Sequence, residues 1–453
     1  MSHVEEVRNW ERNMINRRHF ALRMSGTLGA LAIAPAAAFA DQLSVTVALS
    51  NRLEHELAEL GDAAAPELMA DDEKFWARVR SAYTLNPDVV NFDHGWTNPT
   101  TRAAIEELVR GARQLEALPA EELGRLFFGS SSTGVRAALA EAMGVPTAEI
   151  AVVRNATEAL NTVLLGLPLN TDDEIVCSAH DYFAMLDALE QRRARDGVVL
   201  RMISPPLPAP SLEGLAELYE AVIGPRTRLV LVTHPSNLTG QLLPVQRIAA
   251  AAHRVGAEVV VDGAQSLGVQ GEPVSALDCD YYGASAHKWL GTPVGLGGLW
   301  MRPAHVAKIW PIVPPPPDVT GMRRFEWIGT APAYLQPAAL PSLALHRSLG
   351  AARKAARLRY LSSYLRKRIT VALPNARFYT VAEPAMSIGI TTIELSGVLS
   401  DSLQERLRER HHILTQSMAG NKRAPEIRGL RITPNVYTTP VEIDRLVAAL
   451  KAG

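Results

Sequence analysis

The fold is decided by the stretch Val259-Val260-Val261-Asp262-Gly263-Ala264-Gln265, an apolar run that ends on a carboxylate. A second stretch follows it, Tyr282-Gly283-Ala284-Ser285-Ala286-His287-Lys288-Trp289, and leads into a glycine-rich segment. A carboxylate and a lysine separated by one strand and one loop are what pyridoxal phosphate (PLP) requires. The lysine amine forms a Schiff base with the cofactor aldehyde, and the carboxylate keeps the pyridine nitrogen protonated as an electron sink. The two stretches therefore predict a PLP site built from Asp262 and Lys288.

Short apolar runs of the same type recur upstream and alternate with amphipathic helical segments between residues 88 and 299. The runs are Ile150–Val153, Glu174–Cys177, Leu229–Val232 and Val259–Val261. None of them alternates apolar with polar residues, as is typical of strands that are buried on both faces of a parallel α/β sheet. Open parallel sheets bind ligands at the carboxyl ends of their strands, which is where Asp262 lies.

The junction after Ile150–Val153 predicts a phosphate site. Asn155 can cap the following helix, and Glu158 completes the spacing of a capping box. A helix N-terminus offers free backbone N–H groups and the positive end of the helix dipole, so it is a ready phosphate site. Taken alone this is an ordinary strand-to-helix junction, and Ser285–Lys288 taken alone is compatible with a surface turn. The apolar, glycine-rich flanks of the second segment favour the site.

Seven motifs, taken in their order along the chain, resemble those of the class V aminotransferase family of PLP enzymes. They are Asn155–Glu158, Asp181-Tyr182, Ser236–Gly240, Asp262–Gln265, Ser285–Lys288, Gly329-Thr330 and the C-terminal Arg431, and the resemblance covers nearly everything from Phe75 to Leu450. Within the family the chain is similar to the isopenicillin N epimerase-like branch, as judged from Phe75-Trp76, Asn91–Gly95, Arg154–Glu158 and Asp181–Met185. The resemblance implies the PLP-dependent transferase fold of type I. This fold is an α/β large domain with a mainly parallel seven-stranded sheet, a small α+β C-terminal domain, and a homodimer.

The resemblance also implies a role for each residue. Lys288 matches the Schiff-base lysine and Asp262 the partner of the pyridine nitrogen, while Asn237 and Gln265 match groups near the phenolic oxygen. Tyr182 falls where the family stacks a ring on the cofactor, and the phosphate is assigned to Ala156, Thr157, Ser285 and His287. Gly329 and Thr330 match the loop that reaches the cofactor of the neighbouring subunit. Arg431 matches the arginine that holds the substrate α-carboxylate, for which its fork of donors is suited.

The chain departs from the cysteine desulfurases of the family, which carry a nucleophilic cysteine on a loop after a small-domain helix. The corresponding region, His411–Arg423, contains none, so desulfurase activity of that type is not expected. The only cysteines, Cys177 and Cys279, lie in apolar stretches that favour buried free thiols over a disulfide. Adjacent histidines point apart on a helix, so His411 and His412 predict no metal site.

The predicted chemistry takes place at the α-carbon of an amino acid, through an external aldimine, with Lys288 as the base. Return of the proton to the opposite face is epimerisation, return to the cofactor is transamination, and loss of a β-substituent is lyase chemistry such as C–S cleavage. All three use the same residues and stay open. Tyr182 and His94 are the candidates for a second acid by placement. A non-catalytic exported PLP- or amino-acid-binding protein is a further alternative, disfavoured because a binder needs no electron sink.

The organisation of the 453 residues is predicted from the remaining patterns. Arg17-Arg18, a mildly apolar run at Met24–Ala34 and Ala38-Phe39-Ala40 resemble a twin-arginine (Tat) signal peptide over residues 1–40; an amphipathic helix that is retained is the alternative. Export by the Tat machinery after folding in the cytoplasm implies a periplasmic location and no membrane attachment after processing. A net charge of -1 gives no reason to expect a nucleic-acid partner.

Four segments are expected: the signal peptide, a helical segment over residues 41–87, a large PLP-binding domain over 88–330 and a small domain over 331–453. Helices are predicted at Pro244–Val255, at Pro440–Leu450 and, as one long helix, at Pro341–Ile369. The proline-rich stretch Pro311–Pro317 predicts a loop near the end of the large domain.

Overall fold

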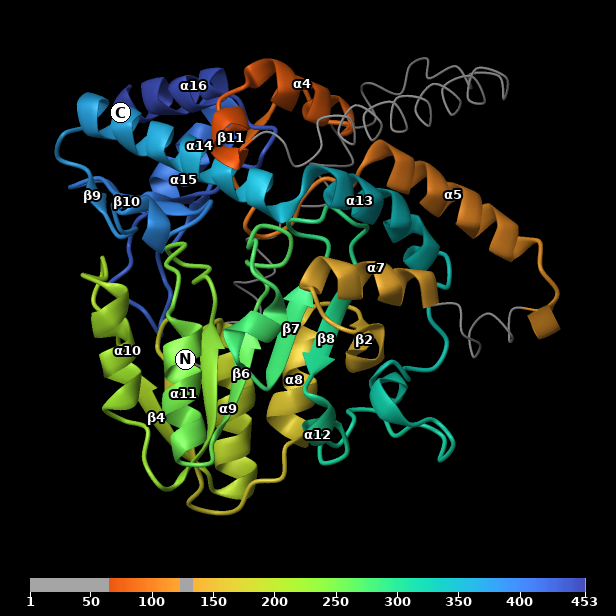
Figure 1. The fold of residues 1–453 in the computed structure, drawn as a ribbon. Coiled ribbons are helices and arrows are strands. Elements are labelled where there is room, and N and C mark those ends of the chain that lie inside the picture. Colours follow the sequence, from red (N-terminus) through yellow and green to blue (C-terminus); the bar gives the residue numbers. More distant parts are fainter. Residues whose placement is uncertain (1–64, 123–132, 453) are drawn as a thin grey trace, which may run out of the picture. The chain divides into compact units, whose positions relative to one another are not determined.

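A seven-stranded sheet forms the centre of the larger part of the fold (Figure 1). The computed structural model describes residues 65–122 and 133–452, so the predicted signal peptide lies outside the described residues. The strand order is β2-β8-β7-β6-β5-β3-β4. The strands are β2 (Ile150–Val153), β3 (Glu174–Ser178), β4 (Val199–Ile203), β5 (Thr227–Thr233), β6 (Glu258–Asp262), β7 (Tyr281–Ser285) and β8 (Gly297–Met301). Only the pairs made by β8 are antiparallel, which confirms the expected mainly parallel sheet.

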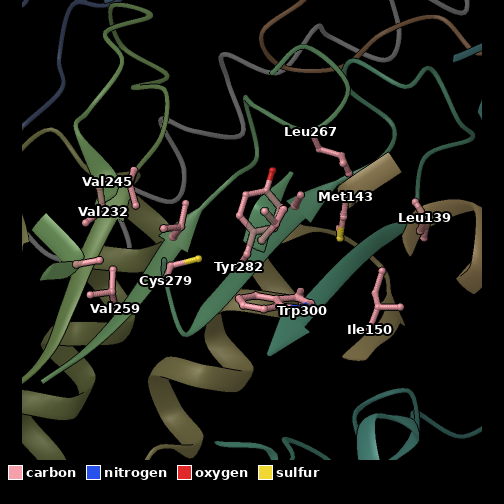
Figure 2. Packing of buried hydrophobic residues seen from close by; sticks show 14 of the residues in the cluster. Leu139, Met143, Ile150, Val232, Val245, Val259, Leu267, Cys279, Tyr282 and Trp300 are labelled. Atoms are coloured by element: carbon pink, nitrogen blue, oxygen red, sulfur yellow. The ribbon is translucent and has the colours of Figure 1, made fainter. Parts of the chain in front are cut away.

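Both faces of this sheet are covered. Val259 and Val261 on β6 belong to one core cluster, while Val260 between them belongs to another. Residues of α7 (Thr133–Met143), α10 (Leu212–Glu220), α11 (Val245–Arg254) and α13 (Leu335–Leu349) contribute to the first cluster. Residues of α8 (Ala156–Gly166) and α9 (Phe183–Asp196) contribute to the second. Figure 2 shows the first cluster, with Tyr282 and Trp300 on neighbouring strands. This two-sided burial is the reason why the strands show no polar alternation.

A smaller α+β part is formed by the C-terminal residues, as fold type I requires. Its antiparallel sheet has the order β12-β13-β10-β9, with β9 (Arg377–Phe378), β10 (Thr391–Glu394), β12 (Gln416–Ser417) and β13 (Leu430–Ile432). Its helices are α14 (Ala351–Ala372), α15 (Ser400–His411) and α16 (Pro440–Lys451). The domain boundaries at residues 88 and 331 stay predictions. Among the described residues, no helix has the length and apolar character needed to cross a bilayer.

The N-terminal described segment joins this C-terminal part. It consists of η2 (Pro66–Met69), α4 (Glu73–Ser81) and β1 (Val90–Asn91), which pairs in parallel with β11 (Ile413–Leu414). On α14 the fully buried Arg357 guanidinium donates to both carboxylate oxygens of Glu73, at 2.6 and 3.0 Å, and to the Val436 and Thr438 carbonyls. In Figure 1, α4 lies beside α16, and Arg80 pairs with Glu442 at 2.8 Å. These contacts bring residues 91–98 against the strand that carries Arg431.

The remaining elements are α5 (Arg102–Glu116), η3 (Thr147–Glu149), η4 (Val274–Leu277), α12 (Pro303–Val306), η5 (Gly321–Phe325) and η6 (Pro384–Met386). The helices predicted at Pro244–Val255 and Pro440–Leu450 are confirmed to within one residue, and Pro311–Pro317 contains neither helix nor strand. The single long helix predicted at Pro341–Ile369 is wrong. Gly350 separates α13 from α14 with a φ of 77°, a conformation that glycine adopts without the steric cost of a Cβ atom.

Replacing Gly263 by alanine is expected to destabilise the large sheet by about 1–3 kcal/mol, the usual cost of overpacking. A Cβ atom at Gly263 would lie 2.1 Å from the Tyr282 ring, itself buried in the first core cluster. Urea unfolding followed by circular dichroism measures the effect. Gly224→Ala is the matched control, because nothing lies within 4 Å of its added Cβ. Equal stability of the two variants would contradict the close contact.

Candidate active site

The carboxyl ends of the central strands bring the predicted site residues to one edge of the sheet. In register, Asp262 at the end of β6 lies opposite Thr233 on β5 and Gly283 on β7. Ser285 is the last residue of β7, and Lys288 lies in the turn that follows. Strands of a parallel sheet end together, so residues that are separated in the sequence meet here without any further constraint.

Asp262 and Lys288 influence each other electrostatically. Burial raises the pKa of the Asp262 carboxyl, whereas the Ala264 N–H, 3.0 Å from Oδ1, and the charge of Lys288 lower it. Burial lowers the pKa of Lys288 to about 8, although Asp262 opposes this shift; the Arg431 charge adds to it. An appreciable fraction of the Lys288 amine is therefore neutral at physiological pH, and only this form is a nucleophile and proton acceptor.

The predicted phosphate residues gather at the N-terminus of α8. The Ala156 N–H donates to Ser285 Oγ at 2.9 Å, and the Asn155 side chain caps the helix by accepting from the Glu158 N–H at 2.9 Å. In a capping box the Glu158 carboxylate would accept from the backbone N–H of Asn155. Here it accepts from the backbone N–H of Arg154 instead, at 2.6 Å. Thr157 is exposed in the first turn.

The His287 ring completes this group. Its Nδ1 atom is buried and has no hydrogen-bond partner among the described residues. Burial and the neighbouring Lys288 charge lower the pKa of His287 to about 4, so the ring is neutral at physiological pH. A buried ring nitrogen without a hydrogen-bond partner is a group to which a ligand can bind. The nitrogen donates to a ligand oxygen when it carries a hydrogen and accepts a hydrogen from the ligand when it does not.

Tyr182 and Asn237 flank the centre. Tyr182 precedes α9 and is half-buried; burial and Asp262 raise the pKa of its hydroxyl, while Arg431 lowers it, which places the hydroxyl within electrostatic reach of both charges. The Asn237 Oδ1 atom is buried and has no hydrogen-bond partner in the described part of the chain, and the Asn237 backbone carbonyl accepts from Arg431 Nη1 at 3.1 Å. Lys288 and Arg431 are likewise coupled, so Tyr182, Asp262, Lys288 and Arg431 form one electrostatic group.

Gln265 makes contacts that its predicted role did not include. Its amide nitrogen donates to the Gly95 carbonyl at 2.7 Å, and its amide oxygen accepts from the Trp289 indole at 3.0 Å. Because an amide nitrogen carries two hydrogens, one stays available for the phenolic oxygen that the resemblance assigns to it. Gln265 thus links the loop at Gly95 to the residue that follows Lys288.

Three residues that the sequence did not single out hold the lysine segment in place. Asn98 Nδ2 donates to the Lys288 carbonyl at 2.8 Å, and Asn98 Oδ1 accepts from Asn435 at 2.6 Å. The buried Lys354 on α14 donates to the Trp289 carbonyl. No local signal could have identified these polar residues, because Asn98 and Asn435 are 337 positions apart.

The other predicted residues are placed as follows. The buried His94 ring meets Tyr437 edge-on at 5.4 Å, and burial lowers the pKa of His94 to about 4. The ring is therefore neutral at physiological pH. Gly329 and Thr330 are exposed between η5 and α13, and their predicted role involves a second chain.

Cys177 and Cys279 are buried free thiols, as predicted, and burial raises the pKa of each. His411 ends α15, and His412 follows it in a left-handed conformation. Within residues 65–122 and 133–452, no group of three or more histidine, cysteine or acidic side chains could hold a metal ion.

Comparison with known proteins identifies the family. The aminotransferase class-V family profile matches residues 97–446. The chain is 32% identical to isopenicillin N epimerase of Streptomyces clavuligerus and 30% identical to that of Amycolatopsis lactamdurans, over 83% of this chain and 98% of each relative. Among solved structures, a mutant of C-DES with glycine covalently linked to its PLP cofactor shares the fold. Its TM-score is 0.72 at 24% identity, over 82% of this chain and 98% of that one.

The residues at the strand ends fit PLP. Lys288 can hold its aldehyde and Asp262 its pyridine nitrogen, while the start of α8, with Ser285 and His287, suits its phosphate. The unpartnered buried atoms Asn237 Oδ1 and His287 Nδ1 belong to the same set. The cofactor is PLP, and this chain belongs to the class V aminotransferase family of PLP-dependent, fold-type I enzymes.

Proposed function

We propose that this enzyme acts at the α-carbon–hydrogen bond of a small-molecule amino acid, as an epimerase or an aminotransferase, in the manner of isopenicillin N epimerase. The observation that carries the proposal is the electrostatic group formed by Lys288, Asp262 and Arg431 at the carboxyl edge of the sheet. A lysine whose pKa lies near 8 can take a proton, and an arginine beside it can orient a carboxylate. PLP, when bound, supplies the electron sink that makes the α-proton acidic.

Each residue then has one task. The neutral Lys288 amine removes the α-proton, the Asp262 carboxylate holds the charge of the pyridine nitrogen, and Arg431 binds the α-carboxylate. Tyr182 supplies the second proton if the enzyme is an epimerase; burial raises the pKa of its hydroxyl, so the hydroxyl keeps its proton at physiological pH. For an aminotransferase, Lys288 would again be the residue that returns the proton, and bound PLP would supply the position that accepts it.

A β-lyase that cleaves a C–S bond is the second candidate. It is supported by relatives named cysteine desulfurase, one of them 30% identical over 71% of this chain, and by the similar fold of the cystine C–S lyase C-DES. The absence of a cysteine in His411–Arg423 opposes a desulfurase that uses a cysteine nucleophile. It does not oppose elimination, which needs only the groups described above.

The test is α-proton exchange, followed by NMR in D2O. The PLP-loaded protein is incubated with a panel of L- and D-amino acids, with and without a keto acid. Exchange that yields the opposite enantiomer identifies an epimerase, and exchange coupled to keto-acid consumption identifies an aminotransferase. Release of the β-substituent identifies the lyase. No exchange and no elimination with any amino acid would refute the proposed chemistry.

Attachment of PLP to the apoprotein is expected to accelerate as the pH rises and to level off above pH about 8, because burial lowers the pKa of the attacking Lys288 amine to about 8. Below that pH the amine is protonated and cannot attack the aldehyde. Stopped-flow recording of the visible absorption of lysine-bound PLP gives the rate. A midpoint near 10.5, the ordinary value for lysine, would contradict the shift.

A homodimer with a shared site, and Tat export to the periplasm, are part of the same proposal. Exposed apolar side chains lie in or beside the site loops, with Trp96 70%, Val294 65% and Phe183 56% exposed, and a second subunit would cover them. Gly329 and Thr330 would then reach the partner's cofactor. Light scattering after size-exclusion chromatography tests the dimer, and cell fractionation of the full-length protein tests the export.

A further inference from the structure

Arg431, the arginine assigned to the substrate carboxylate, already forms an ion pair with a carboxylate of its own chain. Arg431 Nη2 lies 2.9 Å from Asp93 Oδ1 in an ion pair, and Nη1 donates to the Asn237 carbonyl at 3.1 Å. The Arg431 side chain is 8% exposed and that of Asp93 is 21% exposed. Arg431 Nε is buried and has no partner among the described residues. A second carboxylate must therefore share Nη2 with Asp93 or displace it.

The backbone presents Asp93 to Arg431. Asp93 forms a β-bridge with Thr433, two residues beyond Arg431 on the same extended segment. The Thr433 N–H donates to the Phe92 carbonyl at 2.6 Å, and the Asp93 N–H donates to Asn91 Oδ1 at 2.8 Å. A Cβ atom at Gly95 would lie 3.4 Å from Arg431 Cζ, so the loop also follows the guanidinium closely. The main-chain bond between Thr433 and Phe92 and the Asn91 side chain hold the backbone at Asp93, unlike in an ion pair between two exposed, freely rotating side chains.

We propose that Asp93 is a built-in competitor for the carboxylate site on Arg431 and makes the resting enzyme discriminate against carboxylates that carry no amine. The proposal rests on the proposed role of Arg431 as the α-carboxylate site. A free carboxylate either displaces Asp93 or shares Nη2 with it, and while Asp93 stays its charge repels the incoming carboxylate. An amino acid that is also held through its amine meets Arg431 at a high effective concentration, so it can displace Asp93 where an untethered anion cannot.

The test is propionate binding to the PLP-loaded enzyme, measured by isothermal titration calorimetry. Asp93→Asn keeps the size of the side chain and removes its charge, so propionate is expected to bind about tenfold more tightly than to the wild type. The KM of an accepted amino acid should fall by less than this. A gain of affinity is not a result that a damaged fold produces, which separates the proposal from a purely structural role for Asp93.

Three further variants complete the experiment. Asp187→Asn is the matched control, because Asp187 pairs with Arg423 on the protein surface and should leave propionate binding unchanged. Adding Arg431→Gln to Asp93→Asn should abolish the gain. If Asp93→Asn does not fold, Asp93→Ala replaces it and is likewise expected to bind propionate more tightly than the wild type. Unchanged or weaker propionate binding in folded Asp93 variants, or a gain that survives loss of Arg431, would overturn the proposal.

The result of the propionate-binding experiment does not depend on whether the enzyme catalyses the proposed reaction. Propionate undergoes no chemistry, so a gain of affinity in Asp93→Asn supports the competitor role even if no amino acid exchanges its α-proton. Conversely, normal exchange together with unchanged propionate binding would refute the role of Asp93 and leave the proposed function standing.

Discussion

Replacement of Lys288 by alanine is expected to lower the rate of α-proton exchange by a factor of about 10^4, the upper range for loss of a positioned general base. In the proposed mechanism the residue supplies both the covalent anchor for PLP and the amine that takes the proton. Its pKa, lowered to about 8 by burial, makes it the group of the site best matched to that task. The measurement is NMR exchange with the amino acid that the wild-type enzyme processes fastest, at saturating PLP.

Two controls separate loss of the base from loss of the cofactor or the fold. Addition of a small primary amine should restore part of the exchange in Lys288→Ala, since it replaces the missing group without repairing anything else. Lys308→Ala removes a lysine that pairs with Glu258 at the other end of β6 and should retain full activity. Exchange by Lys288→Ala at a rate near that of the wild type would show that another group removes the proton.

Asp262→Asn is expected to lower the exchange rate by about 10^2 to 10^3, as for the removal of a preorganised charge from a buried site. An amide has the shape of the carboxylate but cannot balance a protonated pyridine nitrogen, so the electron sink weakens. The Asp262 charge also raises the pKa of Lys288, so its loss should move the pH midpoint of PLP attachment below about 8. Exchange and PLP attachment are measured on the same preparation.

The matched control for this variant is Asp280→Asn. Asp280 is a buried carboxylate next to β7, paired with His253 at 2.9 Å and Arg302 at 3.1 Å, and it lies at the end of the strand remote from Lys288. Its loss should leave exchange near the wild-type rate even if stability falls. If both variants lose exchange equally, the effect of Asp262 is structural; if neither loses it, Asp262 is not the partner of the ring nitrogen.

The sequence by itself determined the features that depend on neighbouring residues. The strands β2, β3, β5 and β6 could be predicted because residues buried on both faces must be apolar throughout. The cap at Asn155 depends on a spacing of three residues, and the placement of Asp262 and Lys288 on the fact that parallel strands end at a common edge. The break at Gly350 escaped prediction because a helical apolar pattern continues across it, and glycine is tolerated within such patterns.

Only the tertiary structure decided what surrounds these groups. The contact of Asp93 with Arg431 joins residues 338 positions apart, and that of Asn98 with Lys288 joins residues 190 positions apart. Polar side chains in loops carry no periodicity that would reveal such partners, since their positions depend on how Arg357 and β1 join the N-terminal segment to the C-terminal part. The placement of Asp262 and Lys288 is thus determined by local pattern, whereas the ion pair of Asp93 with Arg431 arises from the packing of distant segments.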